Sequence, residues 1–203
     1  MTAHTLVLAT TNAGKIRELE AAFTGAAGLT LRTLREWPEL PAVVEDGDSF
    51  AANASLKARG YAQATGLPCL ADDSGLCIDA LAGAPGVHSA RFAGPKASDA
   101  DNRHKVLAAL DGRPNAERRA RMCCVLAWTG PKPGAALHLF EGVVQGHIAT
   151  RERGDGGFGY DPIFIPEGET QSFAELPAAH KQAHSHRAQA LAQLRQALQG
   201  LLD

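Results

Sequence analysis

The chain has few cysteines and no long apolar run, and each absence excludes a class of protein. Four of its 203 residues are cysteines, and none form a Cys-x-x-Cys pair, which argues against a structural zinc site and fits a reducing cytoplasm. No apolar run is long enough to span a bilayer. No basic segment followed by a long apolar stretch opens the sequence. We therefore expect a cytoplasmic protein with neither a membrane span nor a signal peptide.

An excess of charge of one sign is also missing. The chain has 20 Lys and Arg residues against 22 Asp and Glu, a net charge of -2. This balance argues against a protein that coats nucleic acid. A hydrophobic content of 45% is typical of a globular protein with a sizeable core. Length and composition together predict a single domain or bilobal unit over residues 1–203.

Apolar runs alternate with helical patterns early in the chain, and two longer apolar runs joined by the turn 130–134 then form a hairpin pattern. Together these patterns predict a mixed α/β sheet. Strands are expected at 4–10, 29–34, 67–72, 76–81, 119–129 and 135–149. Helices are expected at 15–23, at 50–64, from Ser98 to about residue 110, and at 186–202, where Leu191, Leu194, Leu198 and Leu201 share one side.

Two adjacent carboxylates, Asp72 and Asp73, lie between apolar runs in Ala-Asp-Asp-Ser-Gly (71–75). Neighbouring like charges at the end of a buried strand cost energy unless a cation compensates them. Oxygen ligands favour Mg²⁺ or Mn²⁺. A plain turn is the alternative, because Asp, Ser and Gly are all turn formers.

Three further polar segments lie between predicted elements. The segment 10–15 (Thr-Thr-Asn-Ala-Gly-Lys) ends a strand and opens a helix, a place that suits phosphate. The segment 44–48 carries three acids, of which Glu45 would share a divalent ion with Asp73 if folding brings them together. The segment 156–162 (Gly-Gly-Phe-Gly-Tyr-Asp-Pro) allows close approach to a flat ligand. Each is also compatible with an ordinary connection.

The last polar cluster comprises Lys181, His184, Ser185, His186 and Arg187. Arg187 follows a helix start, where the dipole disfavours a cation, so it needs an anionic partner. Cationic side chains in this density can bind a polyphosphate, although a solvated helix entry is a common alternative. These segments offer acids that could bind a metal, cations that could bind phosphates and a glycine loop with aromatic residues that could bind a base. Together they indicate nucleotide polyphosphate chemistry.

Four segments in this order resemble the inosine/xanthosine triphosphate pyrophosphatase family, the non-canonical purine nucleoside triphosphate pyrophosphatases. They are LATTNAGKIREL (8–19), ADDSGLCIDALAGAPGVHSARFAG (71–94), GGFGYDPIF (156–164) and FAEL with HKQAHSHRAQAL (173–191). The resemblance implies a mixed, twisted β-sheet flanked by helices, with two lobes and a nucleotide cleft. It implies Mg²⁺-dependent hydrolysis of ITP, dITP and XTP to the monophosphate and pyrophosphate, with Mn²⁺ as a substitute, by a homodimer.

The resemblance also implies roles for particular residues. Asp73 corresponds to the proton acceptor, and Glu45 and Asp73 correspond to the metal-associated acids. The expected substrate contacts are Thr10, Thr11, Asn12, Ala13, Gly14, Lys15, Ser74, Phe158, Gly159, Tyr160, Asp161, Lys181, His186 and Arg187.

One departure from the family pattern concerns a carboxylate. The family often has Phe-x-Glu-Asn-Ala where this chain has Phe-Ala-Ala-Asn-Ala (50–54), so Ala52 removes an acid. This puts a third acidic ligand in doubt. Two alternatives stay open: a related pyrophosphatase acting on pyrimidine triphosphates, and a nucleotide-binding sensor that no longer hydrolyses.

Overall fold

The computed structural model describes residues 4–26 and 28–202, and for 198–202 it describes the main chain alone. The chain divides into two compact units. Unit 1 takes in residues 1–73, 125–141 and 190–203, and unit 2 takes in 74–124 and 142–189. The extent of the domain over 1–203 stays a prediction, because residues 1–3, 27 and 203 lie outside the described ones.

Six strands form one sheet in the order β2-β1-β3-β4-β5-β6. Their bounds are β1 His4–Leu8, β2 Leu29–Thr33, β3 Cys69–Ile78, β4 Arg119–Thr129, β5 Leu137–Ile148 and β6 Phe164–Pro166. The strand β1 pairs in parallel with β2 and β3, and β5 pairs antiparallel with β6. The predicted mixed sheet is therefore confirmed.

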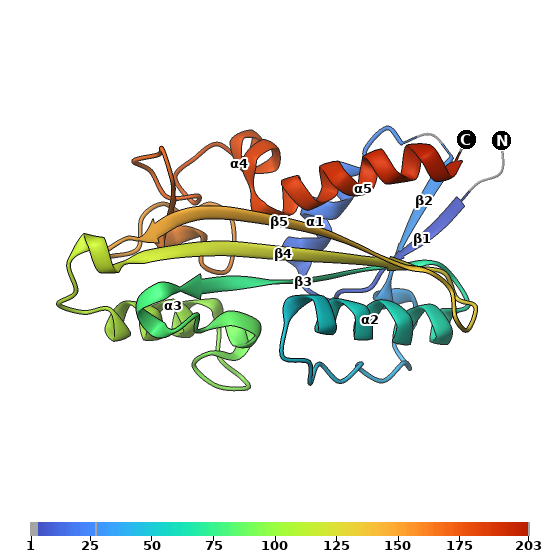
Figure 1. Ribbon diagram of the computed structural model, residues 1–203, viewed down its shortest axis with the longest axis horizontal. Coiled ribbons are helices and arrows are strands. Elements are labelled where there is room, and N and C mark those ends of the chain that lie inside the picture. The colour runs from blue at the N-terminus through green and yellow to red at the C-terminus, as the bar shows by residue number, and fades with distance from the viewer. Residues whose placement is uncertain (1–3, 27, 203) are drawn as a thin grey trace. The chain divides into compact units, whose positions relative to one another are not determined.

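In the part of the chain that the structure describes, five α-helices flank the strands (Figure 1). Their bounds are α1 Ala13–Ala22, α2 Phe50–Thr65, α3 Asp99–Ala109, α4 Ala178–His184 and α5 His186–Leu202. Local signals set the ends of the longer ones. Ser49 caps α2 by accepting the Ala52 N–H at 3.2 Å, and Gly66 ends it with a φ of 69°. Ser98 and Asp101 form the capping box predicted for α3.

In unit 1, α2 packs on one face of the strands. Alternate residues of β1, β3 and β4 share one core with the small buried side chains of α2, as expected from the two-residue period of a strand. This core contains Val7, Ala9, Ala54, Ala58, Ala62, Cys69, Ala71, Val125 and Ala127. Figure 1 shows α1 and α5 on the other side of β3 and β4. Leu191 and Leu194, which were predicted to share one side of α5, are both buried, whereas the side chains of Leu198 and Leu201 lie outside the described ones.

Unit 2 has a core of its own, built largely from long side chains. The helix α3 and its C-cap contribute Val106 and Leu110, and the connection before β6 contributes Tyr160 and Ile163. The strands supply Leu76, Ile78, Ala120, Met122, Ile148 and Phe164, and Phe173 comes from the segment after β6. Within the described ranges no helix is long and apolar enough to cross a membrane.

The structure corrects one expectation and adds two elements. Residues 67–72 and 76–81 are not two strands joined by a turn, because β3 runs without interruption through Asp72 and Asp73. The carboxylates stay in the strand since lysines on the adjoining helices compensate their charge. The short elements α4 and β6 were not predicted, because each is too brief to show a periodic pattern.

Candidate functional site

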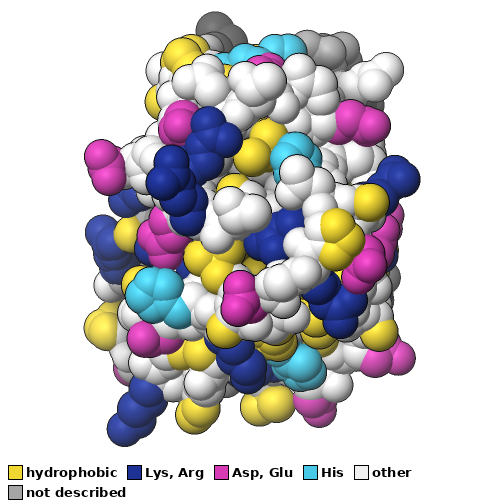
Figure 2. All heavy atoms as spheres, turned by 90° about the vertical axis from the view of Figure 1, so that its left-hand side faces the viewer, with side chains coloured by type: hydrophobic (Ala, Val, Ile, Leu, Met, Phe, Trp, Pro, Cys, Tyr) yellow, Lys and Arg dark blue, Asp and Glu magenta, His cyan; other side chains and the backbone are white. Residues whose placement is uncertain are grey.

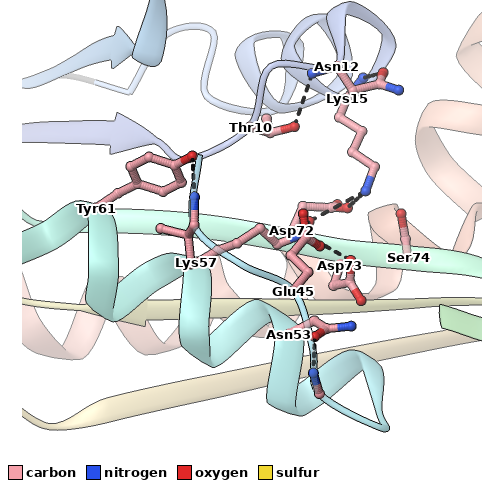
Figure 3. A network of polar contacts seen from close by, with 12 residues as sticks. Thr10, Asn12, Lys15, Glu45, Asn53, Lys57, Tyr61, Asp72, Asp73 and Ser74 are labelled. Atoms are coloured by element: carbon pink, nitrogen blue, oxygen red, sulfur yellow. Dashed lines mark hydrogen bonds and ion pairs between the residues drawn. The ribbon is translucent and has the colours of Figure 1, made fainter. Parts of the chain in front are cut away.

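The loop before α1 is organised by its own side chains (Figure 3). Thr10 Oγ1 accepts the Asn12 N–H at 3.2 Å, and Asn12 Oδ1 caps the helix by accepting the Lys15 N–H at 3.0 Å. Thr11, Asn12 and Ala13 are exposed, and Gly14 is buried. This arrangement leaves a helix N-terminus open to solvent at the point where a strand ends, the setting that favours an anion.

Asp72 and Asp73 point to opposite faces of β3 because they are neighbours in a strand. Asp72 is fully buried, and its Oδ1 lies 2.7 Å from Lys15 Nζ of α1. Asp73 is 7% exposed, and its Oδ1 accepts from Lys57 Nζ of α2 at 2.9 Å. Each carboxylate therefore has a lysine from a different helix.

Lys57 lies at the centre of this polar cluster. Its Nζ donates to Glu45 Oε2 at 2.7 Å, to Asp73 Oδ1 at 2.9 Å and to the Asp72 carbonyl at 2.9 Å. The side chain is 10% exposed. Sequence reasoning missed Lys57. The available signal was its position, because it stands in the buried stripe of α2 formed by residues 53, 54, 57, 58, 61 and 62.

The position of Glu45 follows from a ladder of three side chains on α2, visible in Figure 3. Tyr61, Lys57 and Asn53 are spaced four residues apart and therefore share one face of the helix. The Tyr61 hydroxyl accepts the backbone N–H of residue 43 at 3.2 Å, Lys57 binds Glu45, and Asn53 Oδ1 accepts the N–H of residue 47 at 2.9 Å. The extended segment 43–47 is thereby fixed along α2.

Burial and charge act in opposite directions on this cluster. For Lys57 burial lowers the pKa, but the charges of Asp73 and Glu45 and their hydrogen bonds outweigh it, so the pKa is raised and the ammonium stays charged. For Asp73 burial raises the pKa above its usual range, and the charges of Lys57 and Lys15 only limit the rise. Asp73 thus takes up a proton more readily than an exposed aspartate does.

The donor set of unit 1 fits a divalent cation that a substrate helps to bind. Asp73 Oδ2 is buried and has no hydrogen-bond partner, and such an atom costs free energy unless a donor or cation reaches it. Glu45 is the second carboxylate, 34% exposed. No group of three or more His, Cys, Asp or Glu residues in the described ranges is placed to hold a metal. One or two carboxylates that leave the remaining positions to water and phosphate are typical of Mg²⁺.

Unit 2 contains a second polar cluster around Asp161, which is 1% exposed. Its Oδ2 accepts from Lys181 Nζ at 2.5 Å and from the Phe158 N–H at 2.8 Å. Lys181 Nζ also lies 4.4 Å from the centroid of the Phe158 ring. A Cβ on Gly157 would stand 2.1 Å from Asp161 Oδ2, and the φ of Gly157 is 72°, so a side chain at residue 157 would displace the carboxylate.

The remaining predicted residues of unit 2 fall into two groups. Arg187 is 1% exposed, donates to Ser74 Oγ at 2.9 Å and lies 5.7 Å from the Phe158 ring. His186 is buried as well. Tyr160 instead packs in the core, where its hydroxyl donates to the Ser89 carbonyl at 2.8 Å. The Gly159 N–H donates to Asp99 Oδ2 at 2.8 Å. The face in Figure 2 shows Lys and Arg interspersed with Asp and Glu.

Within each unit, folding brings together residues that the sequence keeps apart. In unit 1 it joins Lys15, Glu45, Asp72 and Asp73 through Lys57. In unit 2 it joins Phe158, Asp161 and Lys181, and also Ser74 and Arg187. The expected roles of these residues in catalysis and binding stay predictions.

The comparisons with known proteins agree with one another. The model of the Ham1 family matches residues 6–197. A dITP/XTP pyrophosphatase from Geobacter sulfurreducens is 47% identical over 190 residues, covering 94% of each chain. A protein of the same name from Geobacillus kaustophilus is 46% identical over 189 residues, covering 93% of this chain and 91% of that one. A solved HAM1 protein from Coxiella burnetii superposes with a TM-score of 0.87 at 41% identity, covering 97% of this chain and 99% of that one.

Proposed function

Because the chain belongs to the Ham1 family, we propose that it hydrolyses non-canonical purine nucleoside triphosphates such as dITP, ITP and XTP to the monophosphate and pyrophosphate. It would thereby remove deaminated purines from the nucleotide pool. The observation that carries the proposal is the cluster of Asp73, Glu45, Lys57 and Lys15. In this cluster Asp73 has a raised pKa, and its buried Oδ2 has no hydrogen-bond partner. Lys57 pairs with Asp73, and Lys15 pairs with the neighbouring Asp72. Relatives with the printed name dITP/XTP pyrophosphatase support the substrate class.

The metal in this proposal is Mg²⁺, with Mn²⁺ as a substitute. Asp73 would hold it through Oδ2, and Glu45 would be the second carboxylate. When bound, a divalent cation offsets the charge that grows on the leaving pyrophosphate.

The residues of unit 1 have distinct parts in the proposed reaction. Asp73 orients or deprotonates the water that attacks the α-phosphorus, and a raised pKa brings the carboxylate closer to the range in which a general base works best. Lys57 holds Asp73 and Glu45 in place. Lys15 and the N-terminus of α1 bind the phosphates, so that orientation and electrostatics carry most of the catalysis.

The residues of unit 2 are proposed to select the base. Phe158 provides a ring for stacking, and Lys181 and Arg187 lie near that ring as donors. A donor that faces the 6-oxo group of hypoxanthine or xanthine is left unpaired by the amino group of adenine. An unpaired buried donor costs about 1–3 kcal/mol, which disfavours ATP.

The test is pyrophosphate release with Mg²⁺ from ITP, XTP, dITP, ATP, GTP and dTTP. We expect strong preference for the first three. Turnover of dTTP instead would make the protein a pyrimidine triphosphate pyrophosphatase, and binding without release would make it a sensor.

The role of Asp73 is tested by Asp73→Asn, with the exposed Asp111→Asn as the matched control. We expect kcat to fall by about 10²–10⁴-fold with KM little changed, and the control to keep full activity. Near-normal turnover of Asp73→Asn would exclude this role. Removal of divalent cations with a chelator should abolish turnover, and added Mg²⁺ should restore it.

A further inference from the structure

Two histidines stand one helical turn apart on α4, outside the polar cluster around Asp161. His180 and His184 occupy positions i and i+4, which share one face of a helix. Their ring centroids are 4.7 Å apart, with an angle of 48° between the planes. Paired imidazoles at this spacing on a helix can ligate one metal ion together. Within the described residues no third His, Cys, Asp or Glu completes a group that could hold a metal with them, so the candidate ligands are the two imidazoles alone.

Glu169 orients one of the two rings. Its Oε1 lies 3.3 Å from His180 Nε2. A carboxylate that accepts a hydrogen bond from one ring nitrogen fixes the orientation of the ring and leaves the lone pair of the other nitrogen for a metal. The His180 side chain is 31% exposed and that of Glu169 is 33% exposed, and His184 is exposed. A hydrated cation can therefore reach the pair and keep water in its other positions.

The helix α4 is short, and its beginning has little local support. It spans seven residues, and Pro177 at its N-cap makes no side-chain hydrogen bond to it. A helix of this length is marginal without external contacts. It nevertheless carries Lys181, which pairs with Asp161 and lies over the Phe158 ring. A cation that bridges the first and last turns of α4 would restrict the motion of the helix that carries this lysine.

We propose that His180 and His184 form a binding site for a late first-row divalent cation such as Zn²⁺, Ni²⁺ or Cu²⁺. Glu169 orients His180, and occupancy of the site stabilises α4 and with it the Lys181–Asp161 pair. Imidazole ligands suit these cations, whereas Mg²⁺ prefers oxygen ligands. The site is thus distinct in chemistry from the carboxylate cluster of unit 1, and it does not depend on the proposed hydrolysis.

The test is a binding titration of the full chain, free of any histidine tag and of nucleotide, with Zn²⁺ and with Cu²⁺. We expect one cation per chain at the pair and nitrogen hyperfine structure in the spectrum of the Cu²⁺ form. His180→Ala and His184→Ala should each raise the Kd by at least about tenfold, because even the loss of an outer-shell partner costs about that much. Glu169→Gln, which replaces the outer-shell carboxylate, should raise it by about tenfold, less than the loss of either imidazole. His88→Ala and Glu167→Gln, which alter exposed side chains of the same unit, should leave it unchanged.

Two results would overturn the proposal. If the double variant His180→Ala/His184→Ala binds Zn²⁺ as the wild type does, the cation sits elsewhere, on thiols or carboxylates, and the site is wrong. If Zn²⁺ binds at the pair but hydrogen exchange of the amides in 178–184 does not slow, the stabilisation of α4 is wrong. Slower exchange in the wild type and in His88→Ala, but not in the double variant, is the expected pattern.

Discussion

Replacing Lys57 with methionine should destabilise the protein and should do so in a pH-dependent way. Methionine keeps most of the packing of the lysine stem but removes three hydrogen bonds and the charge that compensates Asp73. Breaking a buried ion pair costs about 3–5 kcal/mol because the remaining charge has no partner. The nearby Lys15 still acts on Asp73, and Glu45 is partly exposed. We therefore expect a loss near the lower end, about 3 kcal/mol.

The sign of the pH dependence follows from proton linkage. In Lys57→Met the pKa of Asp73 rises further above its unfolded value, because the charge that limited the rise is gone. The folded state then binds a proton more tightly than the unfolded state does, so stability increases as pH falls through the folded pKa. Once Asp73 is protonated, only the loss of ordinary hydrogen bonds remains, about 1 kcal/mol each.

Thermal and urea unfolding at pH 7 and at pH 5 measure the effect. A loss of about 3 kcal/mol corresponds to about 6–12 °C in Tm for a chain of this size. The double variant Lys57→Met/Asp73→Asn should recover part of it, since it removes the orphaned charge, and the coupling energy should be about 2 kcal/mol. Lys132→Met, in an exposed turn of the same unit, is the control. Wild-type stability of Lys57→Met at pH 7, or an equal loss at both pH values without rescue by Asp73→Asn, would refute the reasoning.

Three further changes test other parts of the structure. Tyr61→Phe removes the acceptor for the backbone N–H of residue 43. The free energy of unfolding should fall by about 1 kcal/mol, and half-maximal activity should need a higher Mg²⁺ concentration. An unchanged Mg²⁺ requirement would show that the ladder does not position Glu45. Ala52→Glu should complete a capping box, because residue 52 is the third residue of α2 and the helix has no acid in its first turn. Urea unfolding should show a gain of about 0.3–1.5 kcal/mol in the free energy of unfolding. A lower Mg²⁺ requirement would instead make residue 52 a metal ligand. The hydrogen bond from Cys123 lowers the pKa of Cys77 to about 7. The alkylation rate of Cys77, followed by mass spectrometry, should therefore rise with pH through a midpoint near 7. Cys123→Ala should move this midpoint upward. Cys69, whose pKa burial raises to about 11, is the internal control, and the same midpoint for Cys77 and Cys69 would contradict the assignment.

Most of the long elements could be predicted from the sequence because each carries its own local signals, but the single strand β3 was predicted as two strands. Ser49 and Gly66 cap the two ends of α2, and α3 begins with a capping box. These capping residues indicated the helix ends in the sequence. The strands β4 and β5 lie within their predicted ranges. The elements α4 and β6 were missed because seven and three residues are too few to show a period.

The candidate site could be predicted only in part. Nucleotide chemistry was indicated by the acids, the lysines and the glycine loop at the ends of predicted elements. The resemblance to one family predicted Asp73 and Glu45 as catalytic or metal-binding residues. Lys57 was missed because a lysine within a helix is usually solvated. Only the packing of α2 on β3 shows that this lysine is buried between two carboxylates.

The sequence alone determined the order and type of the long elements other than β3, and its motifs determined the family. These properties depend on local periodicity, capping residues and the identity of neighbouring residues in the chain. Tertiary structure decided that Asp72 and Asp73 stay within one strand, that each has a lysine from a different helix, and that the side chain of Asp161 binds Lys181. The physical reason is that the free energy of a buried charge depends on partners that are distant in sequence, and only the packed chain brings those partners within hydrogen-bond distance.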